Sequence, residues 1–166
     1  MKRLLYASAL AALIPMLPGS TALASQPTRS PTNNQSATFP AGVVCDFAVH
    51  IEPIIDKEVT TTFFDSAGNV TMVLITGDLV TEVSNVDKGT SLTVNISGPA
   101  TITFLDDGTL VFDAVGSWLV ATFPTDSPAR VMFLNRGHIV FTIGPTGVLT
   151  VVSRIGRVQD LCAALA

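Results

Sequence analysis

The sequence predicts an all-β protein, an antiparallel up-and-down β-barrel or alternatively a β-sandwich, with a short C-terminal helix. Beyond residue 57 the chain repeats short runs rich in Val, Ile, Thr and Phe. The links between the runs are short and carry Gly, Asp or Asn, which favour tight turns between antiparallel neighbours. No helical pattern separates one run from the next, so an α/β fold is excluded.

The first strand is expected over residues 43–52, where apolar residues occupy alternate positions. Two later segments, 92–96 and 102–104, alternate in the same way and predict strands with one wet face. Other strands carry apolar residues on both faces. This predicts either that another part of the chain packs on their outer face or that an apolar surface is exposed there. The later runs are approximately 58–65, 69–76, 78–85, 90–97, 100–105, 109–115, 117–123, 130–136, 138–143 and 147–153.

The N-terminal 24 residues have the pattern of a secretory signal peptide. Lys2 and Arg3 precede an apolar run, which ends in an Ala-Leu-Ala cleavage motif. We therefore expect a secreted, extracellular protein with no transmembrane segment, because no later apolar stretch is long enough to span a bilayer. Residues 25–40 are polar and predict a flexible leader that folding does not require. Residues 41–166 are expected to form a single barrel domain with the C-terminal helix.

The charge of the chain argues against nucleic acid and anionic membranes as partners. The sequence has thirteen acidic and nine basic residues, a net charge of −4. Loss of Lys2 and Arg3 with the signal peptide leaves seven basic residues and a net charge of about −6.

Cys45 and Cys162 are the two cysteines of the chain. In an exported protein without a Cys-x-x-Cys motif, they predict one disulfide rather than a metal or redox pair. Cys162 also belongs to an apolar stripe with Val158, Leu161 and Leu165, whose spacing predicts a short amphipathic helix packed on the sheet.

Candidate catalytic and metal-binding groups are few. His50 and Glu52 share one face of the first predicted strand with Asp46, a geometry that suits a metal or an acid/base pair but also an ordinary solvated face. His138 lies far away in the sequence, and the turn 106–108 is too short for a calcium loop. We therefore predict no catalytic residues, no metal site and no cofactor.

Four aromatic residues are the candidates for ligand contacts, because large side chains line or fill the interior of a barrel. They are Trp118, Phe123, Phe133 and Phe141. The expected function is non-enzymatic binding of a small apolar ligand. The alternatives are an extracellular structural or protein-interaction domain with a filled interior, and an enzyme with a polar interior built from His50, Glu52 or His138. The oligomeric state is left open.

The chain ends in Gly-Arg-Val-Gln-Asp-Leu-Cys over residues 156–162, after a signal peptide, a polar leader and short hairpin strands. In these features it resembles small exported proteins of uncharacterised function from high-GC Gram-positive bacteria. The resemblance implies export and a β-rich domain, and it carries over no catalytic residues.

Overall fold

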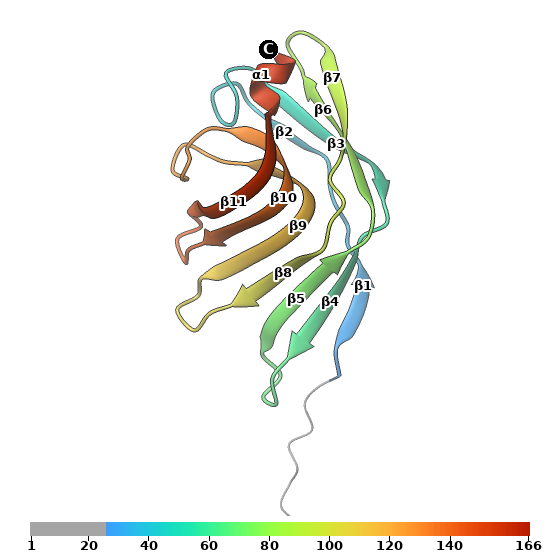
Figure 1. Cartoon of the computed structure of the whole chain (residues 1–166), viewed down its shortest axis with the longest axis vertical. Coiled ribbons are helices and arrows are strands. Elements are labelled where there is room, and N and C mark those ends of the chain that lie inside the picture. Colours follow the sequence, from blue (N-terminus) through green and yellow to red (C-terminus); the bar gives the residue numbers. More distant parts are fainter. Residues whose placement is uncertain (1–25) are drawn as a thin grey trace, which may run out of the picture.

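A computed structural model of the chain describes residues 26–166, so the predicted signal peptide lies outside the described residues. These residues form eleven strands and one short helix, which confirms the all-β prediction with a C-terminal helix (Figure 1). The elements are β1 (Thr28–Pro31), β2 (Ala37–Phe39), β3 (Val49–Asp56), β4 (Val59–Phe64), β5 (Val70–Thr76), β6 (Leu79–Asn85), β7 (Thr90–Asn95), β8 (Ala100–Phe104), β9 (Leu110–Ala121), β10 (Met132–Ile143), β11 (Leu149–Asp160) and α1 (Leu161–Leu165).

The strands form two antiparallel sheets whose spatial order follows the order of the chain. The large sheet has the order β1-β4-β5-β8-β9-β10-β11, and the small sheet has the order β2-β3-β6-β7. Short links carry the chain between the sheets from β3 to β4, from β5 to β6 and from β7 to β8. Backbone hydrogen bonds join these links side by side: the Lys57 N–H donates to the Asp78 carbonyl, and the Ile96 N–H donates to the Leu79 carbonyl. The fold is therefore an antiparallel meander. Its first long strands, β3–β4, β5–β6 and β7–β8, are each interrupted at the short link where the chain passes from one sheet to the other.

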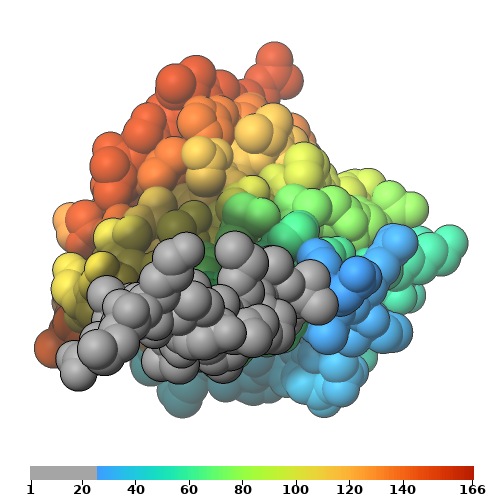
Figure 2. Space-filling model, turned by 90° about the horizontal axis from the view of Figure 1, so that it is seen from below, coloured from blue at the N-terminus to red at the C-terminus, as the bar shows by residue number. Residues whose placement is uncertain are grey.

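Neither sheet closes on itself among the described residues. The large sheet ends at β1 and β11, and the small sheet ends at β2 and β7. Seen from below, the N-terminal strands and the C-terminal strands lie on opposite sides of the molecule (Figure 2). The structure thus does not support the expected closed barrel, and the β-sandwich alternative fits at least as well. Closure depends on strand register and shear, which residue patterns do not determine.

Two apolar cores lie on the opposite faces of β10. Met132 and Leu134 pack with the small sheet and with Leu161 and Leu165 of α1. Phe133, on the alternate face, belongs to a second core together with residues of β8 and β9. This arrangement explains why the sequence of β10 is apolar on both faces, as in strands that are covered on both sides.

The strands β9, β10 and β11 are each twelve residues long and bend together (Figure 1). Gly116 pairs with Gly137, and Gly137 pairs with Gly156, so three glycines form a row across the sheet. We call these residues the glycine row; their φ angles are +102°, +149° and +113°. A Cβ atom at Gly137 would collide with the carbonyl oxygen of Ile155, so the bend needs glycine for both its backbone angles and its close approach. The glycine row bends the strands without ending them. The runs 109–115 and 117–123, expected as two strands, therefore form the single strand β9, and the runs 130–136 and 138–143 form the single strand β10.

The segment expected as a flexible leader contains β1 and β2, which pair with β4 and β3 respectively. Between them, the Asn34 Nδ2 donates to a carboxylate oxygen of Glu58 at 2.9 Å, and the Asn34 backbone N–H donates to Asp56 at 3.1 Å. Burial raises the pKa of Glu58, and the hydrogen bond from Asn34 opposes that rise. All four residues of β1 are exposed, so its pairing depends on the backbone and leaves no apolar pattern in the sequence.

Deletion of residues 26–40 is therefore expected to lower the thermal midpoint by about 5 to 10 °C, because it removes two strand pairings and the Asn34 contacts. The reference is a chain that begins at Gln26, and melting is followed by circular dichroism. A chain that begins at Thr32 is the control, since it loses β1 but keeps Asn34 and β2. A midpoint within one or two degrees of the reference would instead support a dispensable leader.

The C-terminal helix is shorter than its apolar stripe suggested. Val158 belongs to β11, and α1 begins at Leu161, because Asp160 caps the helix and accepts a hydrogen bond from the Ala163 N–H at 2.9 Å. The first strand is shifted as well: β3 begins at Val49, and Cys45 lies in the turns before it.

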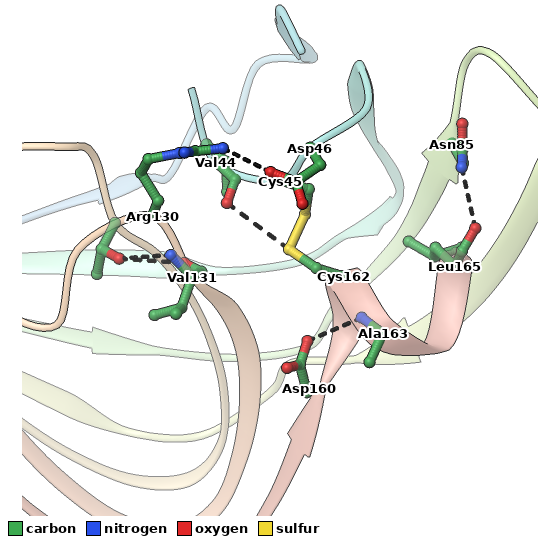
Figure 3. Close-up of a disulfide and its surroundings, with 11 residues drawn as sticks. Val44, Cys45, Asp46, Asn85, Arg130, Val131, Asp160, Cys162, Ala163 and Leu165 are labelled. Atoms are coloured by element: carbon green, nitrogen blue, oxygen red, sulfur yellow. Dashed lines mark hydrogen bonds and ion pairs between the residues drawn. A yellow bond between two sulfur atoms is a disulfide. The ribbon is translucent and has the colours of Figure 1, made fainter. Parts of the chain in front are cut away.

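The structure confirms the disulfide between Cys45 and Cys162, whose Cα atoms are 5.5 Å apart (Figure 3). Next to it, Arg130 donates a hydrogen bond at 2.7 Å to the carboxylate of Asp46. The C-terminal end of α1 is fastened by Asn85, whose amide donates to the Leu165 carbonyl at 3.0 Å. The disulfide thus joins α1 to the turn before β3, and the Arg130–Asp46 pair holds the connection between β9 and β10 to the same turn.

Candidate functional site

A pocket lies in the inner angle of the bent β10–β11 hairpin. Arg154 pairs with Ile139 on one side of the glycine row, whereas Asp160 pairs with Phe133 on the other side. Ile139 and Phe133 are six positions apart, so on a straight strand their Cα atoms would be roughly 20 Å apart. The guanidinium carbon of Arg154 nevertheless lies 4.9 Å from the centre of the Phe133 ring. The bend therefore brings the two halves of the hairpin together around this angle.

The connection from β9 to β10, residues 122–131, covers the angle. It crosses one face of β10 to the outer edge of β11, where the Ser127 N–H donates to the Leu149 carbonyl at 2.9 Å and the Val151 N–H donates to the Ser127 carbonyl at 2.8 Å. The buried carboxylate of Asp126 holds the connection in place by accepting from the Phe123 N–H at 2.6 Å and the Leu149 N–H at 2.8 Å. Beneath it is a pocket of about 380 Å³, lined by Pro128, Val131, Met132, Phe133, Arg154, Val158 and Asp160.

The pocket combines an apolar wall with a cation. Phe133, Val131 and Val158 supply apolar surface, and the Arg154 guanidinium lies over the Phe133 ring in a cation–π contact. Arg154 forms no ion pair with any residue between 26 and 166, whereas Arg130 is paired with Asp46. A guanidinium carries five N–H donors and accepts carboxylates in a bidentate geometry. The pocket therefore suits a small molecule with an apolar body and an acidic group.

Asn135 lies beside the pocket and is fully buried, with an exposed fraction of 0%. It is on the same face of β10 as Phe133 and directly opposite Val158 of β11. Neither its Nδ2 nor its Oδ1 has a hydrogen-bond partner in the described part of the chain. Buried amide groups without partners are rare in folded proteins, so this one calls for a physical explanation.

Of the four aromatic residues predicted to contact a ligand, Phe133 lines the pocket. Trp118 is half-buried in β9 and pairs with Asn135 across the strands. Phe141 stacks on Phe112 with ring centres 4.6 Å apart, on the other side of the glycine row from Phe133. Phe123 is 42% exposed in the connection that covers the pocket. The fold therefore does not gather the four residues around one cavity.

The two histidines considered for catalysis lie in different sheets. His50 in β3 forms a hydrogen bond with the Thr38 hydroxyl at 2.8 Å, and its Nε2 lies 3.5 Å from Glu52. His138 in β10 has its Nε2 2.7 Å from a carboxylate oxygen of Asp113 in β9. Within residues 26–166, no group of three His, Cys, Asp or Glu side chains could hold a metal ion. The two histidines thus form separate surface pairs rather than one polar centre.

Sequence patterns did not identify Arg154, Asn135 or Asp113 as members of a site. Arg154 is one of several scattered arginines, and the partner of His138 depends on the register between β9 and β10. Gly137 and Gly156 could have indicated the bend that forms the pocket, because isolated glycines within strand patterns often mark bends or close backbone approaches.

No family model matches the chain, and no curated protein and no solved structure is similar to it. Among residues 26–166 no helix has the length and apolar composition needed to cross a membrane.

Proposed function

We propose that this protein is secreted and binds a small amphipathic acid in the pocket between β10, β11 and the connection 122–131. The observation that carries the proposal is the Arg154 guanidinium, which lines a pocket of mixed apolar and polar surface and has no ion-pair partner in the described chain. The disulfide is of the kind that persists in oxidising compartments, which supports secretion.

The dimensions of the pocket support a small ligand. A volume of about 380 Å³ falls within the range of small-molecule sites, which are mostly apolar and contain a few polar groups that orient the ligand. The apolar chain of the ligand lies against Phe133 and Val158, and its carboxylate accepts hydrogen bonds from Arg154. Asp160 is a second charge at the pocket, but its carboxylate accepts the helix-capping bond from Ala163.

A titration with octanoate and octanol tests the proposal. Trp118, the single tryptophan, packs against the same core as Phe133 and gives an intrinsic fluorescence signal. Octanoate is expected to cause a saturable change in Trp118 fluorescence, and octanol, which has the same apolar chain without the charge, is expected to bind more weakly. The absence of any saturable change with octanoate would contradict the proposal.

Substitution of Arg154 by methionine is expected to weaken octanoate binding by about 10- to 100-fold, because a charge-assisted hydrogen bond contributes about 1.5 to 3 kcal/mol. The affinity for octanol should change little. The matched control is Arg157→Met, which removes the same charge from the opposite face of the same strand. Equal losses in both variants would show that octanoate responds to net charge rather than to the pocket.

A second candidate function is protein interaction through β11. Beyond the stretch 149–151, where Ser127 is bound, this strand is a free edge of the large sheet, and it exposes Val152 and Ile155 by 62% and 63%. Exposed apolar edge strands tend to pair with other chains. Self-association, measured by light scattering over a range of protein concentrations and abolished by Ile155→Lys, would support this function.

A further inference from the structure

We propose that Asn135 recognises the ligand's own amide, so that the preferred ligand is an N-acylated amino acid with an apolar side chain. This inference rests on the proposed function and specifies its ligand class. The carboxylate of the ligand binds Arg154, its apolar side chain lies against Phe133, and its amide group reaches Asn135.

The side-chain amide of Asn135 has two hydrogen-bonding atoms that a ligand could use. The Nδ2 is a donor and the Oδ1 is an acceptor, and both lack partners although the side chain is fully buried. A buried amide without hydrogen bonds destabilises the fold. A ligand that bonds to both atoms removes this penalty, which favours its binding. The ligand group that fits must present one acceptor and one donor side by side.

An amino-acid residue in an extended conformation presents this pair. Its N–H and its C=O point to the same side, as they do in the hydrogen-bonded pairs of an antiparallel sheet. The N–H of such a ligand donates to Oδ1 of Asn135, and an oxygen of its carboxyl group accepts from Nδ2. The other carboxyl oxygen remains free for the guanidinium of Arg154. A simple fatty acid satisfies Arg154 but offers no donor to Asn135.

Access to Asn135 depends on Val158. The two residues are directly opposite in the register of β10 and β11, so their side chains are neighbours on one face. Val158 lines the pocket and is 39% exposed on the outermost strand. Asn135 itself does not line the pocket, so the proposed ligand displaces this one aliphatic side chain to reach the amide.

The test compares N-acetyl-leucine with its ester analogue, 2-acetoxy-4-methylpentanoate, in which oxygen replaces the amide nitrogen. The two molecules share shape and charge and differ in the N–H donor. The wild-type protein is expected to bind the amide about 10-fold more tightly than the ester, measured by Trp118 fluorescence. This comparison requires no variant and is therefore independent of any effect on folding.

Asn135→Leu supplies the second readout. The variant is expected to bind both molecules with the affinity that the wild type has for the ester, and to melt at a higher temperature, because the unpaired buried amide is gone. Asn33→Leu, at an exposed position in the N-terminal segment, is the control and should leave both properties unchanged.

The outcomes separate this inference from the proposed function. Equal affinity of the wild type for the amide and the ester, with octanoate still bound, overturns the role of Asn135 and leaves acid binding intact. Failure of octanoate, N-acetyl-leucine and the ester to bind overturns both. A lower melting temperature of Asn135→Leu would show that the amide supports the fold, which also overturns the role of Asn135.

Discussion

Replacement of Gly137 by alanine is expected to lower the free energy of unfolding by at least about 3 kcal/mol. Gly137 has a φ of +149°, and a Cβ atom there would collide with the carbonyl oxygen of Ile155 on the neighbouring strand. The variant must therefore adopt a strained backbone angle and also separate β10 from β11 in the middle of their pairing. Urea unfolding followed by far-UV circular dichroism measures the loss.

Gly147→Ala is the matched control for the Gly137 variant. Gly147 also has a positive φ, +82°, but nothing lies within 4 Å of the position its Cβ would take. This substitution is expected to cost only about 1 to 2 kcal/mol, the usual penalty for an L-residue in a left-handed conformation. Similar losses in the two variants would mean that the bend accommodates a side chain, contrary to the steric argument. The Gly137 variant should also lose octanoate binding, because the pocket exists only where the hairpin bends.

Removal of the disulfide in a Cys45→Ser, Cys162→Ser double variant is expected to have the other large effect. The bond connects residues 117 positions apart, and for a loop of this length the chain-entropy model gives roughly 4 to 5 kcal/mol. We expect the thermal midpoint to fall by about 10 °C or more. Reaction of the unfolded, unreduced wild type with a thiol reagent should label no cysteine.

Ala163→Ser is a suitable control for the disulfide variant, because it introduces the same hydroxyl at an exposed position of α1. Its midpoint should stay within one or two degrees of the wild type. The variant without the disulfide should also bind octanoate more weakly. Asp160, which lines the pocket, and the Asp46–Arg130 pair, which holds the connection over the pocket, both lie next to the disulfide. An unchanged midpoint would contradict the view that the disulfide holds the chain end against the first strands.

The strand positions were largely predictable from the sequence, but the bend was not. Runs ending near Gly116 and Gly137 were expected to be separate strands, because glycine is equally typical of turns and of bends. What makes these residues a bend is their alignment across three strands, and alignment depends on register. β1 and β2 were missed for different reasons: β1 is fully exposed and pairs through its backbone, whereas β2 packs Phe39 against the core but has only three residues, too few for a pattern.

The candidate site was predictable only in part. Phe133 was among the expected ligand contacts, since a large aromatic residue in a strand apolar on both faces indicates burial. Arg154 was not, because its position near Phe133 results from the bend rather than from sequence proximity. Asn135 was also not expected as a ligand contact. A single polar residue within an apolar strand does not indicate whether its amide has a hydrogen-bond partner in the fold.

The meander has a consequence for the order in which the molecule folds. The strands β9, β10 and β11 each pair with the strand that precedes them in the chain, so this part of the large sheet can form from short loop closures. All of the residues that line the pocket come from the segment 128–160, so the pocket is complete only when β10 and β11 have paired. The angle requires β11 to be paired with β10, and before that pairing β10 presents an open edge to other chains. A ligand of the proposed kind would bind only after this pairing and would therefore stabilise the completed molecule and not its folding intermediates.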